Sequence, residues 1–336
     1  MTKPVQQAEV WSTPDSSRVR HYLDTATYGL PSPAVVEASQ AALRAWEAGT
    51  ADWIHDWDQL GDVSRKTLGT LVGCDMDRVA LMPSTSVAVA HVAWGLEPGS
   101  RVVAPAHEFS SVIYPFLERE QVIKDIEVHL VDAATLCDFD FRESDLVACS
   151  HVDSGTGLRL DLSTLRAATW VAGARLLIDV TQALGAQPQD PVWSQSDYVV
   201  GAAYKWLSCP RGVAFLAVDP SSTPRLPALA ANWRGGLEPY SSFYGPVMRL
   251  AEGSRRMDVS LAWFAWVGAS VALGEALNGP LTGPGSLAQS RELMEDLSAQ
   301  IGLPAPDSQI LTLPMADPLT ARGVLRDAGI AVSARR

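Results

Sequence analysis

Two side chains that could do chemistry together, Asp179 and Lys205, each stand at or just after an apolar run. Lys205 follows the run at 198–203 and lies between Tyr204 and Trp206. A lone lysine among aromatic residues is poorly solvated, so the pKa of its amine should fall, and the neutral, nucleophilic form that makes a Schiff base becomes accessible. The alternative is a surface lysine that extends its ammonium into water, as most lysines do.

Asp179 closes the apolar run 175–178, the point at which a parallel sheet offers groups to a ligand. Burying an unpaired carboxylate is costly, so a buried Asp179 needs a cation beside it. That cation is either a structural arginine or lysine, or a ligand cation such as a protonated pyridine nitrogen. The residue alone does not decide between these two interpretations.

Three hydroxyl residues, Ser84, Thr85 and Ser86, follow the first apolar run, at a predicted strand-to-helix junction. The free N–H groups and the dipole of a helix N-terminus attract an anion such as phosphate, which favours a phosphate-binding loop. The alternative is a plain helix cap in which Ser84 or Thr85 satisfies the first turn.

The elements that must position these groups alternate between strand and helix. Helical patterns at 33–49 and 57–72 each end in or before a glycine, and short apolar runs follow at helix-length intervals, at 78–82, 101–104, 127–131, 146–150 and 175–178. This order predicts an α/β protein with a mostly parallel central sheet. Ligands bind at the carboxyl ends of such strands, where the polar residues described above are found.

Composition limits the classes of partner. The chain has 336 residues, 47% of them hydrophobic and 19% charged, and a formal net charge of −12. An acidic surface repels phosphate backbones and anionic lipid, so we expect a small-molecule partner, with no nucleic acid and no membrane. Four cysteines without a CxxC pair predict neither a disulfide framework nor a metal site, and the absence of an export signal or spanning stretch predicts a cytoplasmic protein.

The chain from Tyr22 onward resembles the aminotransferase class V group of fold-type I pyridoxal-phosphate enzymes. The resemblance rests on an Asp-x-x-Gln-Ala turn at 179–183 and a Lys-Trp-Leu-x-x-Pro-x-Gly element at 205–212. It implies a pyridoxal 5′-phosphate cofactor joined to Lys205 as a Schiff base, with Asp179 paired to the pyridine nitrogen and Gln182 at the phenolic oxygen. It also implies a large cofactor-binding domain at 18–255 and a smaller C-terminal α/β domain at 256–336 with 1–17.

The resemblance assigns further cofactor contacts. Ser84, Thr85 and Ser86 match the phosphate loop, Phe109 falls where the family stacks a ring on the cofactor, and Ser154 stands where an asparagine is common. By the same comparison His107 lies outside the stacking position, and we expect it to be structural or exposed.

The sequence departs from the family near the lysine. Tyr204 replaces the usual histidine and Ala202 the usual serine, so the phosphate loses customary donors. The hydroxyl of Tyr204 is expected to supply one, and Arg255 or Arg256 to supply others across the interface of a homodimer. For a chain that ends at Arg335-Arg336, we leave open a truncation, a carboxylate-binding role for Arg335 or another arginine, and an unusual substrate.

The reaction expected from the resemblance is at the α-carbon of an amino acid, with β-elimination of the C–S lyase type first and transamination second. A cofactor-binding but inactive partner subunit is the third possibility. No cysteine follows Cys209, which argues against the persulfide chemistry of cysteine desulfurases. Four of the eleven tryptophans form two pairs, Trp53 with Trp57 and Trp263 with Trp266. These pairs either wall an apolar substrate or belong to the core, and the core is the commoner place for tryptophan.

Overall fold

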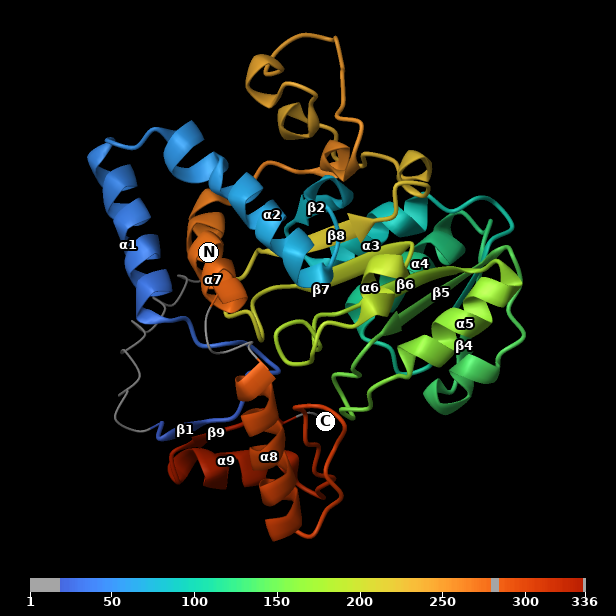
Figure 1. The fold of residues 1–336 in the computed structure, drawn as a ribbon, viewed down its shortest axis with the longest axis vertical. Coiled ribbons are helices and arrows are strands. Elements are labelled where there is room, and N and C mark those ends of the chain that lie inside the picture. Colours follow the sequence, from blue (N-terminus) through green and yellow to red (C-terminus); the bar gives the residue numbers. More distant parts are fainter. Residues whose placement is uncertain (1–18, 279–283, 335–336) are drawn as a thin grey trace, which may run out of the picture.

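A seven-stranded sheet forms the centre of the molecule (Figure 1). The computed structural model describes residues 19–278 and 284–334. The strand order is β2-β8-β7-β6-β5-β3-β4, and only β8 runs antiparallel to its neighbours. This confirms the predicted fold class, a mostly parallel sheet flanked by helices. The strands are β2 (Val79–Met82), β3 (Arg101–Pro105), β4 (Glu127–Val131), β5 (Asp145–Ser150), β6 (Arg175–Asp179), β7 (Tyr198–Ala202) and β8 (Ala214–Val218).

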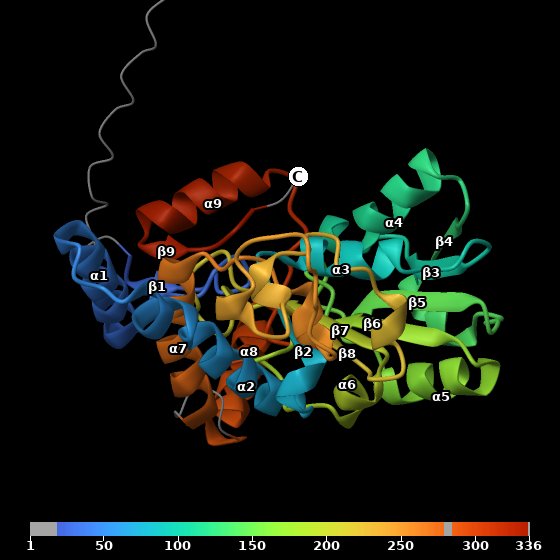
Figure 2. The same ribbon diagram turned by 90° about the horizontal axis from the view of Figure 1, so that it is seen from above.

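Helices cover both faces of the sheet (Figure 2). One face carries α3 (Thr85–Trp94) and α4 (Ser110–Val122), and the other α2 (Leu60–Val72), α5 (Leu162–Ala172) and α6 (Pro191–Gln195). Alternate strand residues enter different cores, because successive side chains point to opposite faces. In β2, Val79 and Leu81 join one hydrophobic cluster, whereas Ala80 and Met82 join the other.

The helix predicted at 57–72 is two elements. Asp52 caps a π-helix (Trp53–Asp58) by accepting the N–H groups of Ile54 and His55, and α2 begins after it. Beside it pack α1 (Pro33–Ala48) and α7 (Trp263–Asn278). The tryptophans are part of this packing, with ring centroids 5.6 Å apart for Trp57 and Trp263, which supports the core interpretation. Short 3₁₀ segments connect other elements, at Met76–Arg78, Ala133–Asp138, Thr223–Arg225, Trp233–Gly235, Pro239–Ser241 and Ser254–Met257.

The first and the last of the described strands pair in a small unit below the main sheet (Figure 1). Here β1 (His21–Tyr22) pairs in parallel with β9 (Ile330–Ala331), next to α8 (Pro284–Gln300) and α9 (Pro318–Asp327). The domain division at residue 255 stays a prediction, and residues 1–17 and Arg335 lie outside the described residues.

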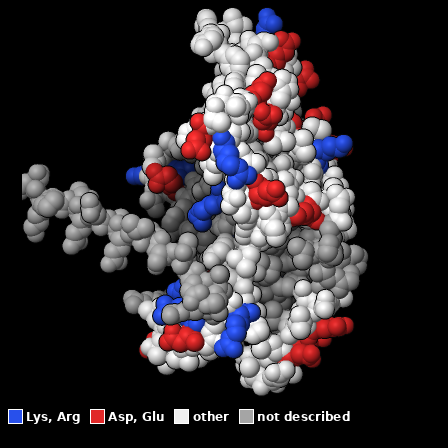
Figure 3. Space-filling view, turned by 90° about the vertical axis from the view of Figure 1, so that its left-hand side faces the viewer, with Lys and Arg blue, Asp and Glu red and all other residues white. Residues whose placement is uncertain are grey.

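No helix among the described residues is both long and apolar enough to cross a membrane, and they contain no group of three or more His, Cys, Asp or Glu side chains that could hold a metal ion. On the face in Figure 3, acidic and basic side chains are interspersed, and neither forms a continuous area. That face offers no basic track for a phosphate backbone.

Candidate active site

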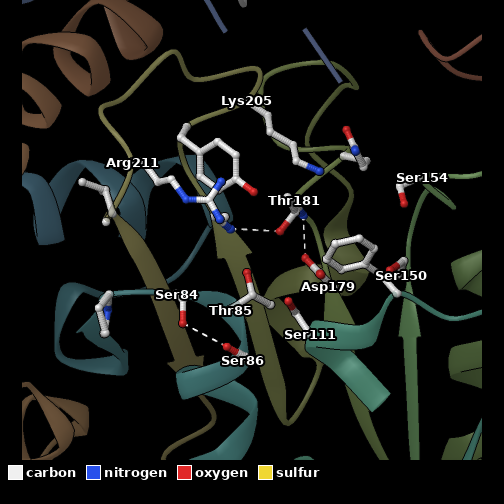
Figure 4. A pocket seen from close by; sticks show the side chains of 17 residues that line it. Ser84, Thr85, Ser86, Ser111, Ser150, Ser154, Asp179, Thr181, Lys205 and Arg211 are labelled. Carbon is white, nitrogen blue, oxygen red and sulfur yellow. Dashed lines mark hydrogen bonds between the residues drawn. The ribbon is translucent and has the colours of Figure 1, made fainter. Parts of the chain in front are cut away.

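A cavity of about 140 Å³ lies at the carboxyl edge of the sheet (Figure 4). Segments after β2, β3, β5, β6 and β7 supply its walls, as expected for an open parallel sheet. Most of the predicted cofactor contacts line it together, although they are far apart in sequence: Ser84, Thr85, Ser86, Phe109, Ser154, Asp179, Gln182, Tyr204 and Lys205.

Lys205 is a buried lysine. It is only 6% exposed, and its Nζ lies 5.6 Å from the centroid of the Phe109 ring. The interpretation of a surface lysine is therefore wrong. The loop that carries it turns tightly, because the Ser208 N–H donates to the Lys205 carbonyl at 2.9 Å and Ser208 adopts a φ of 52°. The Lys205 side chain points into the cavity (Figure 4), where its amine lies beside the Phe109 ring.

Asp179 ends β6 inside the cavity. Its Oδ1 accepts the Thr181 N–H at 2.7 Å, and burial raises the pKa of its carboxyl, against the nearby charge of Lys205. Across the described part of the chain, no arginine or lysine forms an ion pair with Asp179, and the charge that acts on its carboxyl is that of Lys205 in the same cavity. A buried carboxylate that faces a cavity without an ion pair fits a protonated pyridine nitrogen.

The hydroxyl residues after β2 serve the helix and the cavity at once. Ser84 is the N-cap of α3, accepting the Val87 N–H at 3.4 Å, and its Oγ lies 3.0 Å from that of Ser86. The cap interpretation is thus correct for Ser84. Thr85 and Ser86 occupy the first turn, where N–H groups have no partner within the helix, and both also line the cavity. The donor set fits a phosphate group.

Gln182 is oriented by two contacts that sequence reasoning missed. Its Nε2 donates to the carbonyl of Ala26 at 3.1 Å, and its Oε1 accepts the Trp206 Nε1–H at 2.8 Å. The segment before α1 therefore touches the site, and so does the residue after Lys205. The only signal for these contacts was the position of Trp206 beside the lysine.

Glu108 is a second missed residue. Its carboxylate accepts the Ser150 N–H at 2.7 Å, the Ser150 hydroxyl at 2.6 Å and the Phe109 N–H at 2.6 Å. Burial raises the pKa of Glu108 despite these bonds. Glu108 joins the ends of β3 and β5 and so fixes Phe109 against the cavity. His107 is exposed and does not line the cavity, as expected.

Arg256 does not line the cavity of its own chain, and its neighbour Arg255 donates to the carbonyls of Gly236 and Leu237, both at 2.9 Å. The predicted role of Arg255 or Arg256 across a homodimer interface stays a prediction. The four cysteines are free thiols, and none lines the cavity.

The fold is that of fold-type I pyridoxal-phosphate enzymes. Residues 21–236 match the family model described as aminotransferase class-V, and the chain belongs to this family. The family's cofactor is pyridoxal 5′-phosphate, which the donor set of the cavity fits.

Comparisons with individual proteins give more than one activity. A kynureninase from Deinococcus radiodurans is 27% identical over 71% of this chain, and a probable cysteine desulfurase from Pyrococcus abyssi is 23% identical over 61% of it. The matched segments span 60% and 55% of those relatives' own lengths. Among solved structures, a complex of the cystine C–S lyase C-DES with its product cysteine persulfide gives a TM-score of 0.81 at 20% identity, covering 92% of this chain and 88% of that one.

Proposed function

We propose that the chain is a pyridoxal-phosphate-dependent lyase that eliminates a sulfur group from the β-carbon of an amino acid. The observation that carries the proposal is one cavity in which buried Lys205 lies beside Phe109 and Asp179. When bound, the cofactor supplies an electron sink for negative charge at the substrate's α-carbon.

Each group in the cavity has a defined task in this proposal. Lys205 would hold the cofactor through its Nζ, and Asp179 would keep the pyridine nitrogen protonated. Phe109, whose N–H donates to Glu108, would pack on one face of the cofactor ring. Ser84 and its two neighbours hold the phosphate at the N-terminus of α3.

The released Lys205 amine then acts as the base. It takes the proton from the α-carbon, the electron pair of that C–H bond becomes the Cα–Cβ double bond, and the C–S electron pair leaves on sulfur. The sulfur is then protonated, and the unsaturated product hydrolyses in water to a keto acid and ammonia. No oxidant or reductant is consumed.

Elimination is favoured over persulfide transfer because no cysteine lines the cavity: Cys209, nearest to Lys205 in sequence, is buried and burial raises the pKa of its thiol. The structural neighbour C-DES is a cystine C–S lyase, so cystine is the first compound to test. Kynurenine is the second, because several matching relatives are kynureninases.

The test supplies purified protein with pyridoxal phosphate and L-cystine and measures pyruvate, ammonia and released sulfur. The proposal expects these products from the wild type and from Cys209→Ala, and none from Lys205→Ala. Conversion of the cofactor to pyridoxamine phosphate would support transamination instead. No reaction of the cofactor-loaded protein with either amino acid or with a panel of S-substituted cysteines would favour an inactive partner subunit.

A homodimer is part of the proposal, with Arg256 reaching the phosphate of the other copy. Light scattering of the purified protein measures its molar mass in solution and so tests the dimer. Arg256→Gln is expected to weaken cofactor binding without changing that molar mass. A monomer that binds the cofactor fully would contradict it.

A further inference from the structure

Arg211 is a cation that lines the cavity. It belongs to the loop that carries Lys205, and its guanidinium carbon lies 4.9 Å from the centroid of the Tyr204 ring. Both residues line the cavity, and Figure 4 shows Arg211 on the side opposite Ser154, above Ser84. Within residues 19–278 and 284–334, no aspartate or glutamate forms an ion pair with it.

This part of the cavity needs a positive charge if it holds a phosphate. A phosphate ester carries about −1.5 to −2 charges near neutral pH. Within one chain, Ser84 and its neighbours supply hydrogen bonds, but no full charge. The amine of Lys205 lies beside the Phe109 ring. Arg211 is the other cation in the described cavity wall.

We propose that Arg211 binds the phosphate of the cofactor, and that the Tyr204 ring holds its guanidinium in place. Planar guanidinium groups stack on aromatic rings and bind phosphate with two parallel hydrogen bonds. An arginine stacked on Tyr204 thus supplies the positive charge that the hydroxyl residues lack. The inference rests on the proposed function, because it assumes the same cofactor.

The test uses two ligands that cannot react with Lys205: 4′-deoxypyridoxine 5′-phosphate and 4-deoxypyridoxine, which lacks the phosphate. Calorimetric titration of the wild type with each ligand gives two affinities, and their ratio is the contribution of the phosphate. Arg211→Gln is expected to weaken binding of the phosphorylated ligand about 10- to 100-fold, the range for a hydrogen bond to a charged group, and to leave the other ligand unchanged.

Matched variants separate the causes. Arg44→Gln removes an exposed arginine on α1 and should leave both affinities as in the wild type. Arg211→Lys keeps the positive charge but not the planar guanidinium that makes two parallel hydrogen bonds. It should therefore bind the phosphorylated ligand more tightly than Arg211→Gln and less tightly than the wild type. Tyr204→Phe keeps the ring, so a smaller loss than in Arg211→Gln is expected.

Two results would overturn the inference. One is an Arg211→Gln variant that binds the phosphorylated ligand as well as the wild type does while its KM for the amino acid rises, since Arg211 would then serve the substrate's carboxylate. The other is an equal loss for both ligands, which would indicate a general disturbance of the cavity. A wild type that binds neither these ligands nor pyridoxal phosphate would instead refute the proposed function.

Discussion

Replacing Gly29 by alanine is expected to displace the backbone that carries Lys205. A Cβ built at Gly29 would lie 2.0 Å from the Lys205 carbonyl oxygen and 3.0 Å from the Ser208 Cα, whereas ordinary contact begins at 3.4 Å. Both atoms belong to the backbone, so no side chain can rotate away. The Gly29 N–H also donates to the Tyr204 carbonyl at 2.9 Å, a bond that the displacement would strain.

The size of the effect follows from these two contacts. Forcing an extra methyl group into a packed site costs about 1–3 kcal/mol. Losing the Gly29–Tyr204 hydrogen bond adds about 1 kcal/mol. The free energy of unfolding should therefore fall by about 2–4 kcal/mol. The displaced backbone includes the carbonyl group of Lys205 itself, so the position of the Lys205 side chain should change. The affinity for pyridoxal phosphate should therefore fall in the same variant.

Urea unfolding, followed by circular dichroism, and titration with pyridoxal phosphate measure both effects. The matched control is Gly274→Ala in α7, where an added Cβ meets nothing within 4 Å. Alanine inside a helix is favoured over glycine, so this control should gain about 0.5–1 kcal/mol and bind the cofactor normally. A Gly29→Ala protein with the stability and affinity of the wild type would refute the reasoning.

Three other perturbations test separate parts of the structure. Burial raises the pKa of Asp179, so the folded, cofactor-free protein keeps a proton that the unfolded chain releases, and stability falls as pH rises above about 4. Asp179→Asn should thus be more stable than the wild type at pH 7 but not at pH 4 in urea titrations, and should bind the cofactor less tightly; equal stability at pH 7 would contradict this. Burial lowers the pKa of His151 to about 4, so the unfolded chain gains the proton first and stability is lost as pH falls from about 6.5 to 4. At about 1.4 kcal/mol for each pH unit the loss is about 3 kcal/mol, and His151→Asn should remove that part of the acid sensitivity in the same titrations. Arg234→Met leaves the fully buried Asp58 without its cation and should cost about 3–5 kcal/mol in unfolding free energy, a loss that the added change Asp58→Asn should partly reverse.

The sequence predicts the strands well where they are buried on both faces. β3 and β6 are continuous apolar runs, and such runs need no knowledge of their neighbours. The prediction omits β8, a short apolar run after the lysine loop. Nothing in such a run shows that it joins the sheet, or that it pairs antiparallel with its neighbours. The π-helix before α2 is also missed, since its residues continue a helical pattern.

The sequence predicts those site residues whose type and immediate neighbours indicate their role. A lysine among aromatic residues and a carboxylate at a strand end each carry a local signal, and both residues line the cavity. The contacts that orient them carry none. Gly29 with Tyr204, and Glu108 with Ser150, are hydrogen bonds between segments distant in sequence, and only the fold brings them together.

The most direct test of the account is to locate the lysine that holds the cofactor. The chain has four lysines, Lys3, Lys66, Lys124 and Lys205, so borohydride reduction of the pyridoxal-phosphate-loaded protein followed by peptide mass mapping can distinguish them. We predict a visible absorbance band at about 420 nm, present in Lys66→Ala and absent in Lys205→Ala, and a reduced adduct on Lys205. An adduct on Lys66 or Lys124, or a band that persists in Lys205→Ala, would contradict the central claim.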